Sequence, residues 1–284
     1  MTDEARVQEY RKAISSIESR IGDARLMAVS KTRSLDEVMD AYEAGARLFG
    51  ENHVQEIVEK FSVDGKPGRP DDMELHMIGH LQSNKVNKVV PLVDMIESID
   101  SLQLLQKVDR AAKNCGKVID VLLEVNTSGE ESKSGFGSED ELYGCLDASK
   151  ELRNVHIRGL MTVGPVSCRP EDKDRLTAKA FAYLKGLFDS IGRSDAYPHV
   201  DMDVLSMGMS GDYMIGVENG STEVRIGTSI FGARDYGKNY GQDNMTDPSV
   251  SVGSENGDAL EKGNAKDHAL GHGDCNPPEK GASR

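Results

Sequence analysis

Leu26-Met27-Ala28-Val29-Ser30-Lys31-Thr32 is an apolar run that ends in an amine, and a turn and a helical pattern follow it directly. The run has the composition of a fully buried strand, which places Lys31 at that strand's C-terminal end. Burying a lysine is costly, and desolvation lowers its pKa and makes its neutral amine available as a nucleophile. The run predicts either a Schiff-base lysine at a barrel mouth or an ordinary lysine whose stem follows the rim into solvent.

Two similar turns lie near the end of the chain, in VLSMGMSGD (204–212) and VRIGTSIFG (224–232). Each begins as a short apolar strand and turns through Gly with Ser or Thr into a helix. Such turns direct backbone N–H groups at an anion. Two of them after the last strands of a strand–helix repeat are typical of the phosphate site of an eight-stranded barrel. The alternative is that the glycines serve turn geometry alone.

Strand-like and helical segments alternate along most of the chain. We expect strands at 25–30, 47–50, 74–79, 93–98, 118–125, 155–162, 203–207 and 223–227, and helices at 3–22, 34–45, 52–62, 101–114, 138–151 and 171–191. Eight strands separated by helices indicate an α/β fold, a single (β/α)8 TIM barrel with an extra N-terminal helix. The chain of 284 residues is long enough for such a barrel, which needs about 250. An open doubly wound sheet is the alternative.

The composition changes after the last predicted strand. Residues 236–284 are rich in Gly, Asn, Asp and Ser, and hardly any branched apolar or aromatic residue follows Tyr240. We therefore expect a barrel domain over 1–235 and a disordered acidic tail over 236–284. His268, His272, Asp274 and Cys275 have side chains that bind metals, but the glycines at 271 and 273 oppose a preset geometry. We predict no metal site.

Charge and composition exclude several classes of partner. The formal net charge is -14 and the pI is about 5.0, which argues against nucleic acid and anionic membranes. No window approaches the roughly 18 apolar residues that span a bilayer. The polar, acidic N-terminus is not typical of a signal peptide. The cysteines at 115, 145, 168 and 275 are widely spaced, as expected of reduced thiols in a cytoplasmic protein.

Polar segments fall where several of the predicted strands end. They are FGENHVQE (49–56), HMIGHLQSNK (76–85), VNTSGEESKSG (125–135) and GLMT (159–162). Barrels of this kind place their chemistry at the C-terminal ends of the strands. These segments are therefore expected to face the same mouth as Lys31.

Seven segments, in this order, carry a resemblance to a known family: AVSKT, FGEN-x-VQE, H-x-IGHLQSNK, VN-x-SGE-x-SK-x-G, GLMT, LSMGMS-x-D and GST-x-VRIGT-x-IFG-x-R. Over about residues 5–234 the chain resembles the YggS/PROSC-type pyridoxal 5'-phosphate (PLP)-binding proteins. This PLP homeostasis family is related to the N-terminal barrel of alanine racemase. The tail lies outside the resemblance.

The resemblance implies a cofactor and a set of residues that bind it. Lys31 would hold PLP as a Schiff base, Arg225 would face the pyridine nitrogen, and Asn52 would reach the phenolic oxygen. The residues implied at the phosphate are Ser206, Met207, Ser210, Gly227 and Thr228. An arginine is always protonated and only donates, so it would keep the pyridine nitrogen unprotonated and weaken the electron sink. A weak sink suits a carrier, or a racemase that avoids side reactions.

The choice between carrier and enzyme depends on a second acid or base, which a PLP racemase needs on the opposite face of the cofactor. Alanine racemase takes it, a tyrosine, from a separate C-terminal domain, whereas only Tyr236 and Tyr240 follow the barrel here. We therefore expect a PLP homeostasis protein with little or no turnover, a monomer that serves PLP-dependent apo-enzymes. The alternatives are a PLP-dependent amino-acid racemase or lyase that uses Lys31 as its base, and a cofactor-free class I aldolase.

Overall fold

The computed structural model of the protein describes residues 3–130, 132–166 and 168–233. The predicted tail over 236–284 lies outside these residues, and so do His268, His272, Asp274 and Cys275.

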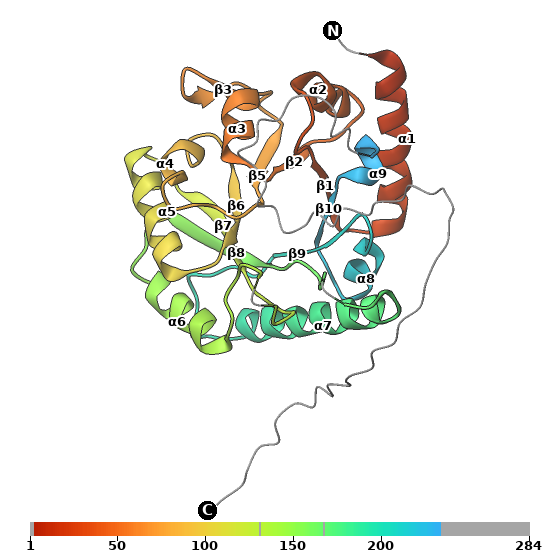
Figure 1. The fold of residues 1–284 in the computed structure, drawn as a ribbon. Coiled ribbons are helices and arrows are strands. Elements are labelled where there is room, and N and C mark those ends of the chain that lie inside the picture. The colour runs from red at the N-terminus through yellow and green to blue at the C-terminus, as the bar shows by residue number, and fades with distance from the viewer. Residues whose placement is uncertain (1–2, 131, 167, 234–284) are drawn as a thin grey trace, which may run out of the picture. The chain divides into compact units, whose positions relative to one another are not determined.

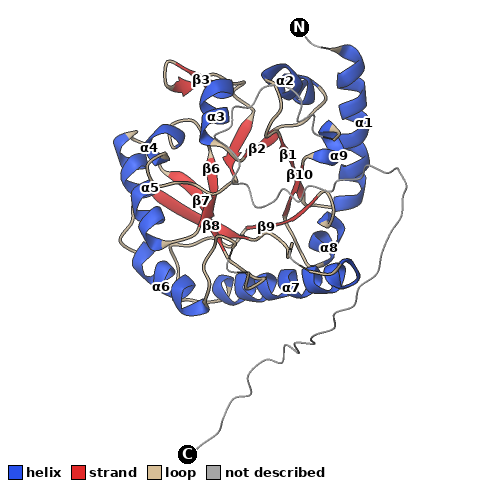
Figure 2. Ribbon diagram, viewed as in Figure 1, coloured by secondary structure: helices blue, strands red, loops and turns tan. Residues whose placement is uncertain are grey.

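Eight parallel strands close into a barrel with helices around it (Figures 1 and 2). They are β1 (Arg25–Val29), β2 (Leu48–Glu51), β5 (Glu74–Met77), β6 (Met95–Ile99), β7 (Ile119–Glu124), β8 (Val155–Met161), β9 (Val204–Met209) and β10 (Glu223–Ile226). Their order around the barrel is β1-β10-β9-β8-β7-β6-β5-β2, and β2 pairs back with β1. All eight predicted strands are confirmed, and the open-sheet alternative is wrong.

The six predicted helices are confirmed within about two residues at each end. They are α1 (Glu4–Ile21), α2 (Leu35–Glu43), α3 (Val54–Phe61), α5 (Leu102–Asn114), α6 (Glu139–Ser149) and α7 (Lys173–Gly192). The short helices α8 (Tyr213–Glu218) and α9 (Thr228–Phe231) follow the two Gly turns, where a helix was predicted without bounds. The prediction missed the other short elements: β3 (Ser62–Val63), β4 (Lys66–Pro67), α4 (Val86–Val89) and η1 (Pro170–Asp172). Such elements are too short to show a periodic pattern. Within the described residues, no helix is long and apolar enough to cross a membrane.

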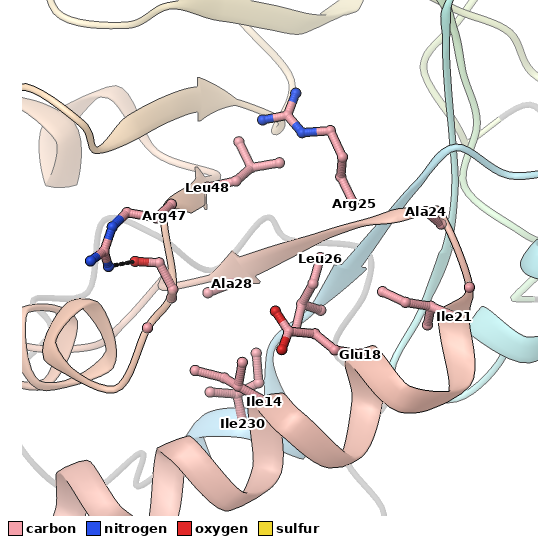
Figure 3. Close-up of a pocket in the computed structure, with 13 residues that line it drawn as sticks. Ile14, Glu18, Ile21, Ala24, Arg25, Leu26, Ala28, Arg47, Leu48 and Ile230 are labelled. Carbon is pink, nitrogen blue, oxygen red and sulfur yellow. Dashed lines mark hydrogen bonds between the residues drawn. The ribbon is translucent and has the colours of Figure 1, made fainter.

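Side chains alternate between the two faces of each strand, and this decides what the barrel holds inside. On β1, Leu26 and Ala28 pack against the helices with Ile14 of α1, whereas Arg25 lies on the opposite face (Figure 3). One part of the interior is apolar and is filled by Met95, Leu122, Met161 and Val204. Other interior positions, on β5, β6 and β10, carry buried ionisable side chains: His76, Glu97, Glu223 and Arg225.

The N-terminal helix closes the side of the barrel where its first and last strands meet. Tyr10 of α1 contacts Phe231 of α9 edge to face, with ring centroids 5.2 Å apart. Arg6 of α1 donates through Nε to Asp40 of α2 at 2.5 Å. Because α2 follows β1 and α9 follows β10, α1 fixes both elements that follow the predicted cofactor turns.

Gly159 allows β8 and β9 to approach closely, and its replacement tests the packing of the barrel. Its φ is 151°, and a Cβ atom there would lie 1.8 Å from the carbonyl oxygen of Val204. We expect Gly159→Ala to lower the free energy of unfolding by about 3 kcal/mol, or Tm by roughly 6–12 °C. In the control Gly144→Ala, the new methyl group meets no atom within 4 Å. This change in α6 should instead raise the free energy of unfolding, by at most about 1 kcal/mol. Equal melting temperatures of the two variants would contradict the β8–β9 packing.

Candidate functional site

Lys31 lies in a tight turn two residues after β1. The backbone N–H of Arg33 donates to the carbonyl of Ser30 at 3.1 Å and closes this turn. Thr32, inside the turn, has a φ of 66°. Residues other than glycine rarely adopt this conformation, and such strain concentrates at functional sites. Because β1 is parallel to β10 and to β2, the Lys31 turn lies at the C-terminal end of the barrel strands.

A buried ionic cluster of Glu51, Glu56 and Lys60, which we call the Lys60 cluster, holds both neighbours of Lys31. The Glu56 carboxylate accepts the backbone N–H of Thr32 at 2.7 Å, and Glu51 accepts the hydroxyl of Ser30 at 2.7 Å. The Lys60 ammonium donates to the Ser30 carbonyl at 3.0 Å, to Glu51 at 2.9 Å and to Glu56 at 2.7 Å. Three side chains therefore hold the strained turn at the residues on either side of Lys31.

Burial and ion pairing oppose each other in the Lys60 cluster. Burial raises the pKa of Glu51 to about 7, although the charge of Lys60 opposes the shift. Burial also acts to lower the pKa of Lys60, but the charges of Glu51 and Glu56 outweigh it, so that pKa is raised. Lys60 therefore stays an ammonium at neutral pH, and the two carboxylates depend on it as their cation.

The Lys31 turn also contacts the end of the barrel sequence. Arg33 donates through Nη2 to the carbonyl oxygen of Gly232 at 2.6 Å, and its guanidinium lies 5.7 Å from the ring centre of Phe231. Gly232 directly follows α9, the helix that begins at the second predicted phosphate turn. Two predicted parts of the site, distant in sequence, are thus joined directly.

Arg225 extends from β10 into the barrel and is held at both terminal nitrogens. Its Nη1 donates to the Ser206 hydroxyl at 2.6 Å, and its Nη2 donates to the carbonyl of Thr162 at 2.7 Å. The Ser206 hydroxyl in turn donates to Glu97 at 2.6 Å. Ser206 was predicted at the phosphate, but its side chain is engaged in the interior. That leaves only its backbone for a phosphate.

The structure brings the two predicted phosphate turns together. The backbone N–H of Gly227 donates to the Ser210 hydroxyl at 3.3 Å, which links the turn after β10 to the turn after β9. Met207 is fully buried among the core side chains, so it too could offer only backbone. Thr228 is exposed at the first position of α9. Ser210, Gly227 and Thr228 therefore lie at one end of two neighbouring strands.

Asn52 directly follows β2, on the same end of the barrel as Lys31. Its side-chain oxygen is buried and has no hydrogen-bond partner among the described residues. The backbone there is closely packed, because a Cβ atom on Gly79 would lie 2.3 Å from the Asn52 carbonyl oxygen. A buried acceptor oxygen that lacks a donor is costly, so a ligand group that donated to Oδ1 would be favoured.

Two functional candidates were missed in the sequence, Glu97 and Glu124. Glu97 is the partner of Ser206, as described above. Glu124 ends β7, and its pKa is raised to about 7, mainly by burial and then by the charge of Asp100, against the opposing effect of Arg225. Glu97 lies in the middle of the apolar strand MIESI (95–99), and Glu124 is the last residue of the strand IDVLLE (119–124). A carboxylate in or at the end of an apolar strand was the available signal.

A cavity of about 430 Å³ lies elsewhere, on the outer wall of the barrel (Figure 3). Ile14 of α1, Leu26 and Ala28 of β1, Leu48 of β2 and Ile230 line it. Its wall also includes Ala24 and Arg47, which lie at the N-terminal ends of β1 and β2. The predicted cofactor residues follow the C-terminal ends of the strands, so this cavity is separate from them.

Comparison with known proteins identifies the family. Residues 6–235 match the family model described as the alanine racemase N-terminal domain. The pyridoxal phosphate homeostasis protein of Escherichia coli K12 is 40% identical over 240 residues, which are 81% of this chain and 96% of that protein. The human protein of that name is 40% identical over 218 residues, 75% of this chain and 78% of that protein. The chain belongs to the pyridoxal phosphate homeostasis family.

Solved structures agree with this family assignment, which the sequence resemblance predicted. PipY of Synechococcus elongatus with PLP bound is 32% identical, with a TM-score of 0.69, and the match covers 78% of this chain and all of that one. A structure described as an unknown protein from Bifidobacterium adolescentis is 36% identical, with a TM-score of 0.71, and the match covers 81% of this chain and 97% of that one. Alanine racemase from Streptomyces coelicolor is 18% identical, with a TM-score of 0.63, and it shares the fold over 80% of this chain and 59% of its own.

The Lys60 cluster gives a test of how the Lys31 turn is held. In Lys60→Met, Glu51 and Glu56 would remain buried without their cation. Breaking a buried ion pair in this way costs about 3–5 kcal/mol, so urea titration should show a loss of that size. The control Lys150→Met removes an exposed partner of Asp147, and a surface pair of this kind contributes little to stability. If Lys60→Met costs no more than Lys150→Met, the cluster does not stabilise the turn.

Proposed function

We propose that this protein binds PLP in intracellular PLP homeostasis, holding the cofactor as a Schiff base on Lys31 with little or no catalytic turnover. The observation that carries the proposal is the meeting of Lys31, Arg225 and the two Gly/Ser/Thr turns at the C-terminal end of one parallel barrel. Relatives named pyridoxal phosphate homeostasis protein that match over most of their length support it, as does the PLP-bound structure of PipY.

The chemistry of the donor set fits PLP. A phosphate is suited by the paired turns with Ser210, Gly227 and Thr228, with the backbone of Ser206 and Met207 beside them. The pyridine nitrogen would accept from Arg225. The Asn52 side chain would meet the phenolic oxygen by donating from Nδ2, and the Lys31 amine would meet the aldehyde carbon.

When bound, PLP supplies an aldehyde carbon for amine attack and a ring that withdraws electrons. The residues of this chain would restrain that chemistry rather than drive it. Arg225 stays protonated, so it would leave the pyridine nitrogen without a proton and the ring a poor electron sink. Both terminal nitrogens of Arg225 are already held in the barrel, which fixes its position and limits its movement. These features suit retention of the cofactor.

We also propose that PLP-dependent apo-enzymes receive the cofactor and that the barrel is a monomer. The exposed large apolar residues of the described chain support the second point, because they lie on separate segments of the chain: Leu35, Val63, Val118, Val166, Tyr183 and Met209. Dimers that depend on hydrophobic contact need larger continuous patches. Sedimentation of the purified protein would show a single species near 30.9 kDa.

Replacing the proposed anchor lysine tests the proposal. In Lys31→Ala, borohydride reduction should trap no lysine adduct of PLP, while the circular dichroism spectrum stays that of the native barrel. The wild-type adduct should map to the peptide that contains Lys31. Lys85→Ala, which changes a lysine beyond β5, should keep the wild-type yield. A wild-type yield in Lys31→Ala would contradict the proposed anchor.

The enzyme alternative has its own test. With L-alanine and PLP, the protein should form D-alanine no faster than free PLP does. Turnover on the order of one per second, as in ordinary enzymes, would favour a racemase instead.

Residues 1–235 are proposed to be sufficient for binding, because the family match ends at residue 235. A chain cut after residue 235 should keep its PLP content and its melting temperature within a few degrees. The apolar-poor composition of 236–284 offers little surface to bury against a barrel. A larger fall in melting temperature, or loss of PLP, would show that the tail contributes to the barrel.

A further inference from the structure

A line of hydrogen bonds continues from Arg225 toward the opposite end of the barrel. Arg225 donates to Ser206, and Ser206 donates to Oε2 of Glu97, each at 2.6 Å. The other oxygen of Glu97 lies 2.7 Å from Nδ1 of His76, and Nε2 of His76 lies 2.8 Å from Glu74. Glu97 and His76 are fully buried. The middle of the line therefore lies in the buried interior, and its far end at Glu74 is partly exposed.

Two more side chains complete this line at the N-terminal ends of the strands. Arg25 pairs with Glu74, and its Nη1 lies 3.7 Å from Glu223. Glu223 is fully buried, lies 3.9 Å from Nδ1 of His76, and has no hydrogen-bond partner for either oxygen among the described residues.

The protonation states make the charges alternate along the line. Burial acts to lower the pKa of His76, but Glu74, Glu97 and Glu223 outweigh it and raise that pKa to about 10. Burial acts to raise the pKa of Glu97, but His76 and Arg225 outweigh it and lower that pKa. At neutral pH, the anion Glu97 thus lies between the cations His76 and Arg225.

Glu223 behaves differently from Glu97. Its pKa is raised to about 8, mainly by burial and then by the charge of Glu97, while His76 and Arg25 oppose the shift. It therefore remains mostly protonated at neutral pH. This leaves Glu97 as the carboxylate that carries the negative charge between His76 and Arg225.

The cluster of His76, Glu97 and Glu223 also has the side chains that bind metal ions. The ligating atoms of His76, Glu97 and Glu223 all lie within 4.8 Å of one another. Arg25 and Arg225, however, already place guanidinium nitrogens 3.7 and 4.0 Å from these carboxylates. With His76 protonated as well, the positive charge near the carboxylates comes from side chains, and an added divalent cation would be repelled.

We propose that Glu97 is a positioning residue for the PLP site: through Ser206 it holds the Arg225 guanidinium in place, and His76 holds Glu97 from the other side. The inference rests on the proposed function, because it gives Arg225 the role of facing the pyridine nitrogen. Without the Glu97 charge, His76 and Arg225 would lose the anion between them, and the guanidinium would lose its fixed orientation.

Glu97→Gln is the direct test, with PLP affinity and the absorbance of the lysine-bound cofactor between pH 6 and 10 as readouts. We expect affinity to fall on the order of tenfold, as for the loss of a hydrogen bond to a charged group. The pH midpoint of the absorbance change should also move. Ser206→Ala removes the link with a smaller change of structure, and it should act in the same direction if Glu97→Gln does not fold. Glu151→Gln alters an exposed carboxylate and serves as the control.

A double-mutant comparison separates positioning from a general loss of stability. On an Arg225→Ala background, Glu97→Gln should cause no further loss of PLP affinity. Additive losses, or wild-type affinity and pH midpoint in folded Glu97→Gln and Ser206→Ala, would overturn the inference. If the wild-type chain binds no PLP, the proposed function fails as well. If wild type and Glu97→Gln bind alike, only the inference fails.

Discussion

The parallel pairing of β1 with β10 is the constraint on which the site depends. It joins the first and last strands of the barrel, with Met27 opposite Arg225 and Ala28 opposite Ile226. Because parallel strands end on the same side, the Lys31 turn and the Gly227 turn emerge next to each other. The hydrogen bond from Arg33 to Gly232 and the contact of Tyr10 with Phe231 reinforce this closure. A site assembled from distant segments follows from one pairing.

Buried charge supports the site on both sides of the barrel wall. Outside the wall, the Lys60 cluster holds the backbone on either side of Lys31. Inside it, Glu97 and Ser206 hold the side chain of Arg225. Burying such groups is expensive, and each arrangement is tolerable only because its charges are paired and hydrogen-bonded. At these positions polar groups replace apolar packing, and they fix the backbone beside Lys31 and the guanidinium of Arg225.

The strands, the longer helices and the position of Lys31 could be predicted from the sequence, because their signals are local. Buried strands and amphipathic helices have periods that a single segment displays, and Lys31 stands at the end of one such strand. The direction of the Ser206 side chain could not be predicted, since it depends on β10 beside β9 and on β6 across the closed barrel. The same holds for Glu97, which interrupts an apolar strand but finds its partners on other strands. β3, β4 and α4 were missed because they are too short to show a period.

A crystal structure of the protein with PLP tests the account most directly. We expect electron density that is continuous between Nζ of Lys31 and the cofactor. A terminal nitrogen of Arg225 should lie within hydrogen-bonding distance of the pyridine nitrogen, and the phosphate should lie between the turns of Ser210 and Gly227. PLP attached to another lysine, or bound in the outer cavity beside Ile14 and Ile230, would contradict it.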